Sequence, residues 1–283
     1  MAISVHTNAS ALTALQNLNK TNDELGQVQN RVNTGLKIST AKDNAAIWSI
    51  AQGQRADIGA LAAVQMSLDR AKSISQVAMT AGESVSDLLV QLKEKVVTAQ
   101  DPSLDTASRN AVNSDYKSIL RQITQVVQNS TFDGANILDN SIPAGIKFLA
   151  NADANAYITL SAKNLTLGNG APGSIITMTV ASSIGTVTLA TAILTQLNSS
   201  IVNVNQALGD MGSQAKQIEN HNAFVSKLTD VLTAGVGNLV DADLAKESAR
   251  LQALQVQQQL GVQSLSIANE APQVILQLFR GGG

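Results

Sequence analysis

Side chains that could do acid–base or metal chemistry are few and widely separated in this sequence. Its two histidines, His6 and His221, lie far apart, and neither belongs to a His-Glu-x-x-His motif, which places two zinc ligands on one helix face. Asp241 and Asp243 precede a predicted helix, where carboxylates cap free N–H groups and offset the helix dipole. The turn at 168–170 lacks the Lys-Ser/Thr of a phosphate loop. With no nucleophile beside a base, the residues predict no enzyme, metal site or cofactor.

Composition narrows the class of protein further. The 283 residues are 44% hydrophobic but only 2% aromatic, and the apolar residues are mostly Ala, Leu, Val and Ile. Small aliphatic side chains with few rings suit seams between helices better than a thick globular core. The net charge of -2, with no basic cluster, predicts no nucleic-acid partner. The absence of cysteine excludes disulfides and thiolate metal sites.

The elements that would position any site are long helices, and the clearest is predicted over residues 61–99. Its apolar residues repeat at 3.5-residue spacing, which predicts a coiled-coil-like seam that ends at Asp101-Pro102. One row of this seam contains Leu61, Leu68, Ser75, Gly82, Leu89 and Val96. The other row contains Val64, Ala71, Ala78, Val85, Leu92 and Ala99.

Two further helices repeat this pattern. The short Asp101-Pro102-Ser103 connection predicts that the next helix runs antiparallel to the first. Its rows are Val112, Ile119, Val126 and Tyr116, Ile123, Ser130. The carboxy-terminal arm has rows Ile201, Leu208, Ala215, Asn222 and Val204, Met211, Ile218, Val225. Together the three helices predict a mainly α, elongated bundle.

A small β-rich region is expected between the helical halves. Phe132-Asp133-Gly134 is a turn signal, and β-branched runs separated by Gly, Asn and Pro follow it. The expected strands begin at Ile137-Leu138 and continue at residues 146–149, 157–160, 175–180 and 186–189. About sixty residues leave no room for a large extra domain.

The two outer ends carry apolar stripes that neither segment can bury by itself. Each is an amphipathic helix in a surrounding rich in Asn, Gln and Thr, so each is expected to be frayed when alone and ordered when paired with the other and with further copies. Glutamines crowd the second segment, and they suit either a polar contact between subunits or an ordinary solvated face. The stripes include Leu12, Leu15, Leu18, Leu25, Val28, Val32 and Leu36, then Leu244, Leu251, Leu254, Leu260, Leu265 and Ile267.

The sequence also bears on export and membranes. Residues 1–6 show no basic region followed by an apolar core, so we expect no cleavable signal peptide. No apolar run approaches the length of a bilayer span, and no membrane partner is expected.

Three motifs, in order, resemble those of the bacterial flagellins. The amino-terminal resemblance covers residues 8–18 and 28–46, with the family's Arg, Thr-Gly-Leu turn and Ala-Lys-Asp-Asn-Ala-Ala stretch. Residues 131–138 resemble the turn after the family's second helix. The carboxy-terminal resemblance covers 241–247 and 267–278.

This resemblance implies a layered subunit of a tubular filament. The implied parts are 1–45 and 241–283 as paired inner polymerisation helices, 46–135 and 196–240 as the two halves of a helical bundle, and 136–195 as a β-rich outer segment. The residues implied at the polymerisation interface are Leu15, Leu18, Leu25, Val28, Arg31, Leu36, Leu251, Leu254, Gln258, Leu265, Ile267, Asn269 and Leu278.

The same resemblance implies partners and a location. The chain would polymerise with itself in an extracellular flagellar filament, next to hook-junction and cap proteins, after unfolded export by the flagellar type III apparatus with a dedicated chaperone. Gln91, Lys93 and Glu94 align with the surface that an innate immune receptor recognises. Only the glutamate matches stimulatory flagellins, and glutamine lacks the charge and donor fork of arginine, so weak or no receptor activation is expected.

The sequence departs from the family at residues 234–239. They read Ala-Gly-Val-Gly-Asn-Leu where the family is usually charged, which predicts a looser helix there.

Two other functions are alternatives to a filament subunit. A hook–filament junction protein shares the terminal helices but caps the filament instead of repeating along it. A surface adhesin would use the middle segment, which has Phe148 and Tyr157 but no aromatic platform.

Overall fold

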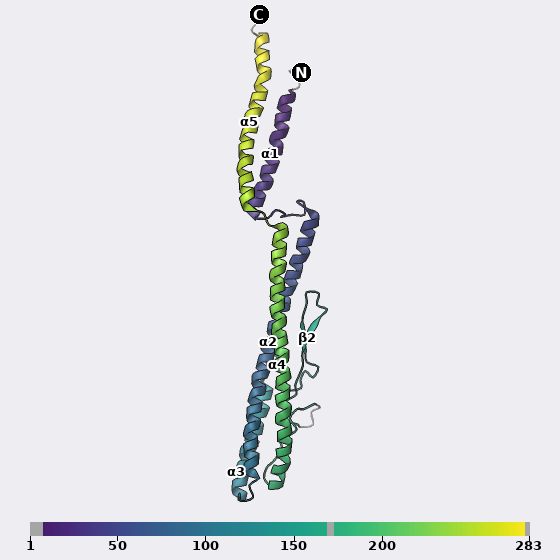
Figure 1. Cartoon of the computed structure of the whole chain (residues 1–283), viewed down its shortest axis with the longest axis vertical. Helices are drawn as coiled ribbons and strands as arrows, with labels where there is room; N and C mark the ends of the chain where they lie inside the picture. The colour runs from purple at the N-terminus through teal and green to yellow at the C-terminus, as the bar shows by residue number, and fades with distance from the viewer. Residues whose placement is uncertain (1–7, 169–172, 281–283) are drawn as a thin grey trace. The chain divides into compact units, whose positions relative to one another are not determined.

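The structure is a computed structural model that describes residues 8–168 and 173–280, without the side chains of 271–280. The part described contains five helices and one two-stranded sheet (Figure 1). In chain order they are α1 (Ala9–Thr34), α2 (Ala45–Ala99), α3 (Thr106–Asn129), β1 (Ile146–Leu149), β2 (Tyr157–Leu160), α4 (Val187–Val240) and α5 (Leu244–Arg280). The chain forms two compact units, residues 57–230 and residues 1–56 with 231–283.

The unit of residues 57–230 is built on the predicted helical seam. Every residue of the two rows expected in α2 is buried, including the two that interrupt the pattern, Ser75 and Gly82. A Cβ atom added to Gly82 would lie 2.7 Å from Leu208 Cδ2 of α4, so glycine leaves room for this leucine. In α4 the row of Val204, Met211, Ile218 and Val225 is buried. The mainly α, coiled-coil-like prediction is confirmed.

Polar contacts fix the direction of the three helices. Asn222 of α4 donates to Asp69 of α2 at 2.7 Å, and Ser86 of α2 donates to Asn205 of α4 at 3.2 Å, so α2 and α4 run antiparallel. The predicted antiparallel pairing of α2 and α3 is confirmed, since Arg109 near the start of α3 donates to the carbonyl oxygen of Ala99 at the end of α2. Further along α3, Asp115 pairs with Lys95 earlier in α2, with 3.5 Å between Asp115 Oδ2 and Lys95 Nζ. Arg109 also donates to the carbonyl oxygens of Asp101 and Leu104 in the connection. The bond to Ala99 satisfies a carbonyl group left free where α2 ends.

The β1–β2 hairpin lies against this bundle. Its strands pair antiparallel, with Ile146 opposite Leu160 and Phe148 opposite Ile158. Leu149 N–H donates to Ser67 Oγ of α2 at 3.1 Å, and the Ala150 carbonyl lies 2.7 Å from His221 Nε2 of α4. His221 therefore has a structural hydrogen-bond partner in the hairpin, and its position needs no bound ligand to explain it.

The other strand predictions were wrong. Residues 186–189 lie at the start of α4, which begins at Val187 behind Thr186, whose hydroxyl accepts from Leu189 N–H. Capping and burial of Ala190 on the bundle outweigh the β propensity of this run. In 175–180 only Ile176 forms an isolated bridge, with Leu167. Ile137 and Leu138 form no strand, although their carbonyls accept bonds from Lys163 and Leu165.

The turn predicted at residues 132–134 is confirmed. Phe132 and Ala135 exchange both backbone hydrogen bonds, at 3.0 and 2.9 Å. Asp133 and Gly134 between them have φ angles of 51° and 73°. Two consecutive positive φ angles define a tight turn that Asp-Gly adopts readily.

The expectation that no run is long and apolar enough to span a bilayer was also wrong. By length and composition α4 meets that criterion, with a mean hydropathy of 1.2 in its most apolar window. Its charged residues are sparse because Asn, Gln, Ser and Thr provide the polar positions. A helix of a packed bundle passes the same test, and α4 buries its Val204–Val225 row in the bundle.

Candidate assembly interface

The unit of residues 1–56 and 231–283 contains the helices α1 and α5, and local sequence sets where each begins. Asn8 caps α1, and its side chain accepts from Ala11 N–H at 3.1 Å. Asp243 caps α5 by accepting from the N–H groups of Ala245 and Lys246, both at 3.1 Å. The capping role predicted for Asp243 is therefore confirmed. Gly35 ends α1 with a left-handed φ of 70°.

Helices α1 and α5 lie side by side and antiparallel (Figure 1). Asn8 Nδ2 donates to the Ala268 carbonyl at 2.7 Å at one end of the pair. Gln258 Nε2 donates to Asn22 Oδ1 at 2.8 Å near the middle. These contacts fix one register between the helices, because each joins a particular residue of α1 to one of α5. The predicted pairing of the chain's two ends is confirmed.

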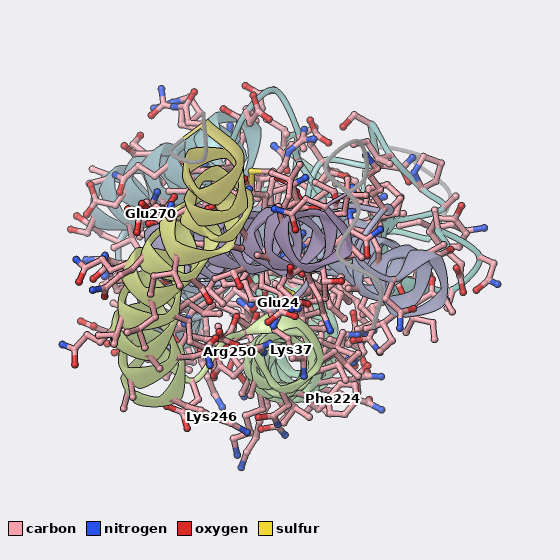
Figure 2. All side chains as sticks on the ribbon, turned by 90° about the horizontal axis from the view of Figure 1, so that it is seen from above. Glu24, Lys37, Phe224, Lys246, Arg250 and Glu270 are labelled. Carbon is pink, nitrogen blue, oxygen red and sulfur yellow. The ribbon has the colours of Figure 1, made fainter. Side chains whose placement is uncertain are left out.

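Two ion pairs reinforce this register. Arg31 Nη1 lies 3.1 Å from Glu247 Oε1, and both side chains are partly shielded from solvent. Arg250 Nη2 and Glu24 Oε2 are 3.4 Å apart and more exposed, and both are labelled in Figure 2. Glu247 also lies in the first turn of α5, where negative charge offsets the helix dipole. The shielded pair therefore contributes more to pairing than the exposed one.

Backbone pairing closes the other end of the helix pair. Lys37 N–H donates to the Val240 carbonyl at 2.7 Å, and Ala242 N–H donates to the Gly35 carbonyl at 2.9 Å. Leu36 and Asp241 thereby form an antiparallel bridge. The predicted Thr-Gly-Leu turn and the segment before α5 are thus held together by main-chain bonds.

The loop between α1 and α2 is organised by Asp43. Its Oδ2 accepts from the backbone N–H groups of Thr40 at 2.9 Å and Ser39 at 3.1 Å, and from both hydroxyls. These bonds, the backbone bond from Thr40 foremost, stabilise the charged carboxylate and lower the pKa of Asp43 below its ordinary value. The aspartate of the Ala-Lys-Asp-Asn stretch therefore has a local structural role.

The apolar seam between α1 and α5 is narrow. Val28 of α1 is 2% exposed and Leu254 of α5 is 4% exposed. A Cβ atom added to Gly261 would lie 3.2 Å from Leu18 Cδ1, so glycine lets α1 approach α5 closely at this point. The seam accounts for one face of each helix only.

A second set of apolar side chains on this unit remains exposed, and we call it the exposed stripe. On α5, Leu260 is 59% exposed and Ile267 is 64% exposed, and on α1, Leu15 is 42% exposed. The remaining members are Leu12 on α1 and Val256 on α5. Exposed apolar side chains on one face of a helix pair are a candidate surface for binding another molecule.

The structure brings most of the predicted interface residues onto the α1–α5 pair, in three environments. Val28 and Leu254 are buried in its seam. The half-buried ones are Leu18, Leu25, Arg31, Leu36, Leu251, Gln258 and Leu265. Leu15, Ile267 and Asn269 are exposed. The Leu278 side chain lies outside the described residues.

Sequence reasoning missed four residues of this pair. Asn22, Glu24 and Arg250 supply polar contacts across it, and Gly261 supplies the close approach. The opposite charges of residues 24 and 250 could have indicated a contact, but only if the register between α1 and α5 had been known. Within the described residues, no group of three His, Asp or Glu side chains could hold a metal ion.

The residues aligned with the receptor surface lie on α2 in the other unit. Gln91, Lys93 and Glu94 are all exposed. Gln91 also lines an open groove of about 570 Å³ between α2 and α3. Their positions leave all three side chains accessible to solvent.

Comparisons with known proteins agree along the whole chain. The family model described as the bacterial flagellin N-terminal helical region matches residues 5–142, and the one described as the C-terminal helical region matches residues 194–279. Flagellin FljJ of Caulobacter vibrioides is 54% identical over 100% of both chains. A flagellin of Brucella melitensis is 39% identical over 98% of this chain and 99% of its own. A putative flagellar hook-associated protein from Vibrio parahaemolyticus has a similar fold, with a TM-score of 0.52 and 15% identity over 70% of this chain and 100% of its own.

Proposed function

We propose that this chain, which belongs to the bacterial flagellin family and is a structural subunit of the flagellar filament, assembles through its α1–α5 pair. The family is one of structural proteins that are exported from the cell. The observation that carries the proposal is the exposed stripe, whose apolar side chains lie in solvent outside the buried seam between α1 and α5. Packing this stripe against further copies would remove it from water.

The mechanism we propose is coupled folding and association. A seam as narrow as that of Val28 and Leu254 stabilises an isolated helix pair weakly. Neighbouring subunits would supply the missing buried surface, so the terminal helices would become fully ordered at the growing end. Subunits in transit would then remain monomeric and join only where neighbours are present.

The layered arrangement belongs to this proposal. Residues 1–45 and 241–283 would form the inner polymerisation layer, residues 46–135 and 196–240 the bundle around it, and residues 136–195 the outer segment. The helix breaks at the Asp43 loop and at the bridge of Leu36 with Asp241 support boundaries near residues 45 and 241. The compact units of the structure divide elsewhere, inside α2 at 56/57 and inside α4 at 230/231. The contacting residues would be the thirteen assigned above to the polymerisation interface.

The partners are proposed on the same basis. The chain would polymerise with itself, meet hook-junction and cap proteins at the filament ends, and leave the cell through the flagellar export apparatus after release from a chaperone. A junction protein is less favoured, because relatives similar over the full length bear flagellin names and the likeness to the hook-associated protein concerns the fold alone.

We also propose that the chain activates the innate flagellin receptor weakly or not at all. Gln91 and Lys93 are exposed but offer no arginine fork. We expect a cell reporter assay to give far lower potency than a stimulatory flagellin, and equal potency would contradict the proposal.

The test of the assembly proposal is seeded polymerisation followed by negative-stain microscopy. We expect long uniform filaments from the full chain, and folded monomers without filaments from chains that lack residues 1–40 or 245–280. Filaments from either truncated chain would overturn the assignment to the terminal helices.

A point variant tests the exposed stripe without removing a helix. Leu260→Ser/Ile267→Ser should raise the critical concentration about tenfold or more, since each loses about 1 kcal/mol of burial in the filament. The control Met66→Ser/Val202→Ser removes two equally exposed apolar side chains from the other unit. Equal effects of the two variants would show that the stripe has no special part in assembly.

A further inference from the structure

The chain passes between its two compact units twice, and both passages lie inside a helix. The first is in α2 between residues 56 and 57, and the second is in α4 between residues 230 and 231. Any change in direction of one unit with respect to the other must therefore bend both helices.

Glycines concentrate beside both passages. Gly53 and Gly59 flank the passage in α2, and Gly235 and Gly237 follow the passage in α4. Glycine is among the poorest helix formers, because it gains the most backbone freedom when the helix opens. Residues 234–239, for which a looser helix was predicted, lie within the continuous helix α4 and contain Gly235 and Gly237.

Close packing does not explain these glycines. A Cβ atom added to Gly53 or Gly59 would meet nothing within 4 Å, and at Gly235 the nearest atom would be Gln54 Oε1 at 3.9 Å. At Gly237 the added atom would meet only the flexible side chain of Asp241. Gly82 differs, because the leucine packed against it needs the space. Alanine would fit at the first three positions and would strengthen both helices.

The core is thin along the same stretches. No residue is buried in 52–60 or in 226–235. Burial resumes directly beyond each stretch, at Leu61 in α2 and at Val236, between Gly235 and Gly237, in α4. Gln54 Oε1, beside Gly235, is buried without a hydrogen-bond partner among the described residues. Few buried contacts would be lost if the helices bent here, so bending costs little.

We propose that Gly53 and Gly59 of α2 and Gly235 and Gly237 of α4 form a paired hinge, which lets the α1–α5 unit change direction relative to the bundle as a subunit joins the filament. The functional part rests on the assembly proposed above. Helices bend sharply where glycine removes side-chain packing, and hinges are short segments that absorb backbone changes. Glycine in both helices meets the requirement that both bend together.

The experiment compares two matched pairs of substitutions in the full chain. Gly53→Ala/Gly59→Ala changes the hinge, and Gly209→Ala/Gly212→Ala changes two helical glycines of α4 away from it. All four sites have nothing within 4 Å of an added Cβ atom, so both pairs should raise helix stability alike. A third variant adds Gly235→Ala to the hinge pair.

The first readout is the distance distribution between spin labels at Gln27→Cys and Ala62→Cys, one in each unit. Labelling is specific because the chain has no cysteine of its own. The hinge pair should narrow the distance distribution. Each Gly→Ala replacement favours the straight helix by about 1 kcal/mol, so the fraction of molecules with bent helices should fall about fivefold per glycine replaced. The control pair should leave the width unchanged. Equal widths in all variants, or equal narrowing by both pairs, would overturn the hinge.

The second readout is the rate of seeded filament elongation. Elongation should slow for the hinge pair and slow further with Gly235→Ala, while the control pair elongates like the unmodified chain. Unchanged elongation despite a narrowed distribution would overturn the role of the hinge in assembly. If the unmodified chain forms no filaments but its distribution still narrows in the hinge pair, the hinge stands and the assembly proposal fails.

Discussion

At the scale of single residues, Tyr116 shows how this fold uses one of its few aromatic side chains. It is fully buried on α3, and its hydroxyl donates to Met178 Sδ at 3.7 Å. Burial raises the pKa of Tyr116 to about 12, against a smaller lowering by Ser182. The ring thereby joins the segment after β2 to the helical bundle.

This pKa predicts alkaline sensitivity. The folded state holds the Tyr116 proton more tightly than the unfolded chain does, so its contribution to stability is complete below pH 10 and is lost as the pH rises toward 12. The loss is roughly 3 kcal/mol across that window. We expect Tyr116→Phe to flatten the fall in unfolding free energy, measured by urea titration at several pH values.

Tyr157→Phe is the matched control, because Tyr157 is the chain's other tyrosine and is largely exposed. It should retain the alkaline loss of the unmodified chain. If Tyr116→Phe also retains it, another group is responsible.

At the scale of elements, Gly145 determines how the β1–β2 hairpin begins. Its φ is 73°, and an added Cβ atom would collide with the Leu160 carbonyl oxygen of the paired strand. Side chains disfavour this φ, and a backbone obstacle cannot rotate away as a side chain can. Glycine is therefore required at this position.

Substitution at this site should be costly. We expect Gly145→Ala to lower the unfolding free energy by about 2–4 kcal/mol, from left-handed strain and the collision together. Gly134→Ala is the control, because Gly134 has the same φ of 73° but nothing within 4 Å of an added Cβ atom. It should lose only about 1 kcal/mol. Thermal melts of both variants measure the difference, and equal losses would show that the collision is relieved.

Sequence reasoning worked best for elements whose pattern is long. Both rows of α2 were predictable because 3.5-residue spacing over 39 positions has no competing interpretation, and all their members are buried. Short β-branched runs such as 186–189 carry too few residues to choose between strand and helix. Burial on a neighbouring helix decided that case, and a single sequence does not contain this information.

At the scale of the whole molecule, the sequence indicated which ends pair but not how they pair. The stripes predicted that α1 and α5 need a partner surface, and their pairing was confirmed. The register depends on single contacts, such as Gln258 with Asn22, that no periodicity specifies. The division into two units was hidden as well, because it falls inside continuous helices rather than in loops.

The β1–β2 hairpin has a practical consequence for protein engineering. Its connection, residues 150–156, includes an exposed tip and joins two short strands that are held by their own ladder. A foreign peptide inserted at this tip would interrupt no helix and would leave the α1–α5 pair untouched. With residues 136–195 as the outer segment proposed above, each subunit would display one copy, and the polymer would present the peptide at regular, repeated spacing. Fusion to either terminus would instead extend the chain next to α1 or α5, the helices that we propose for assembly.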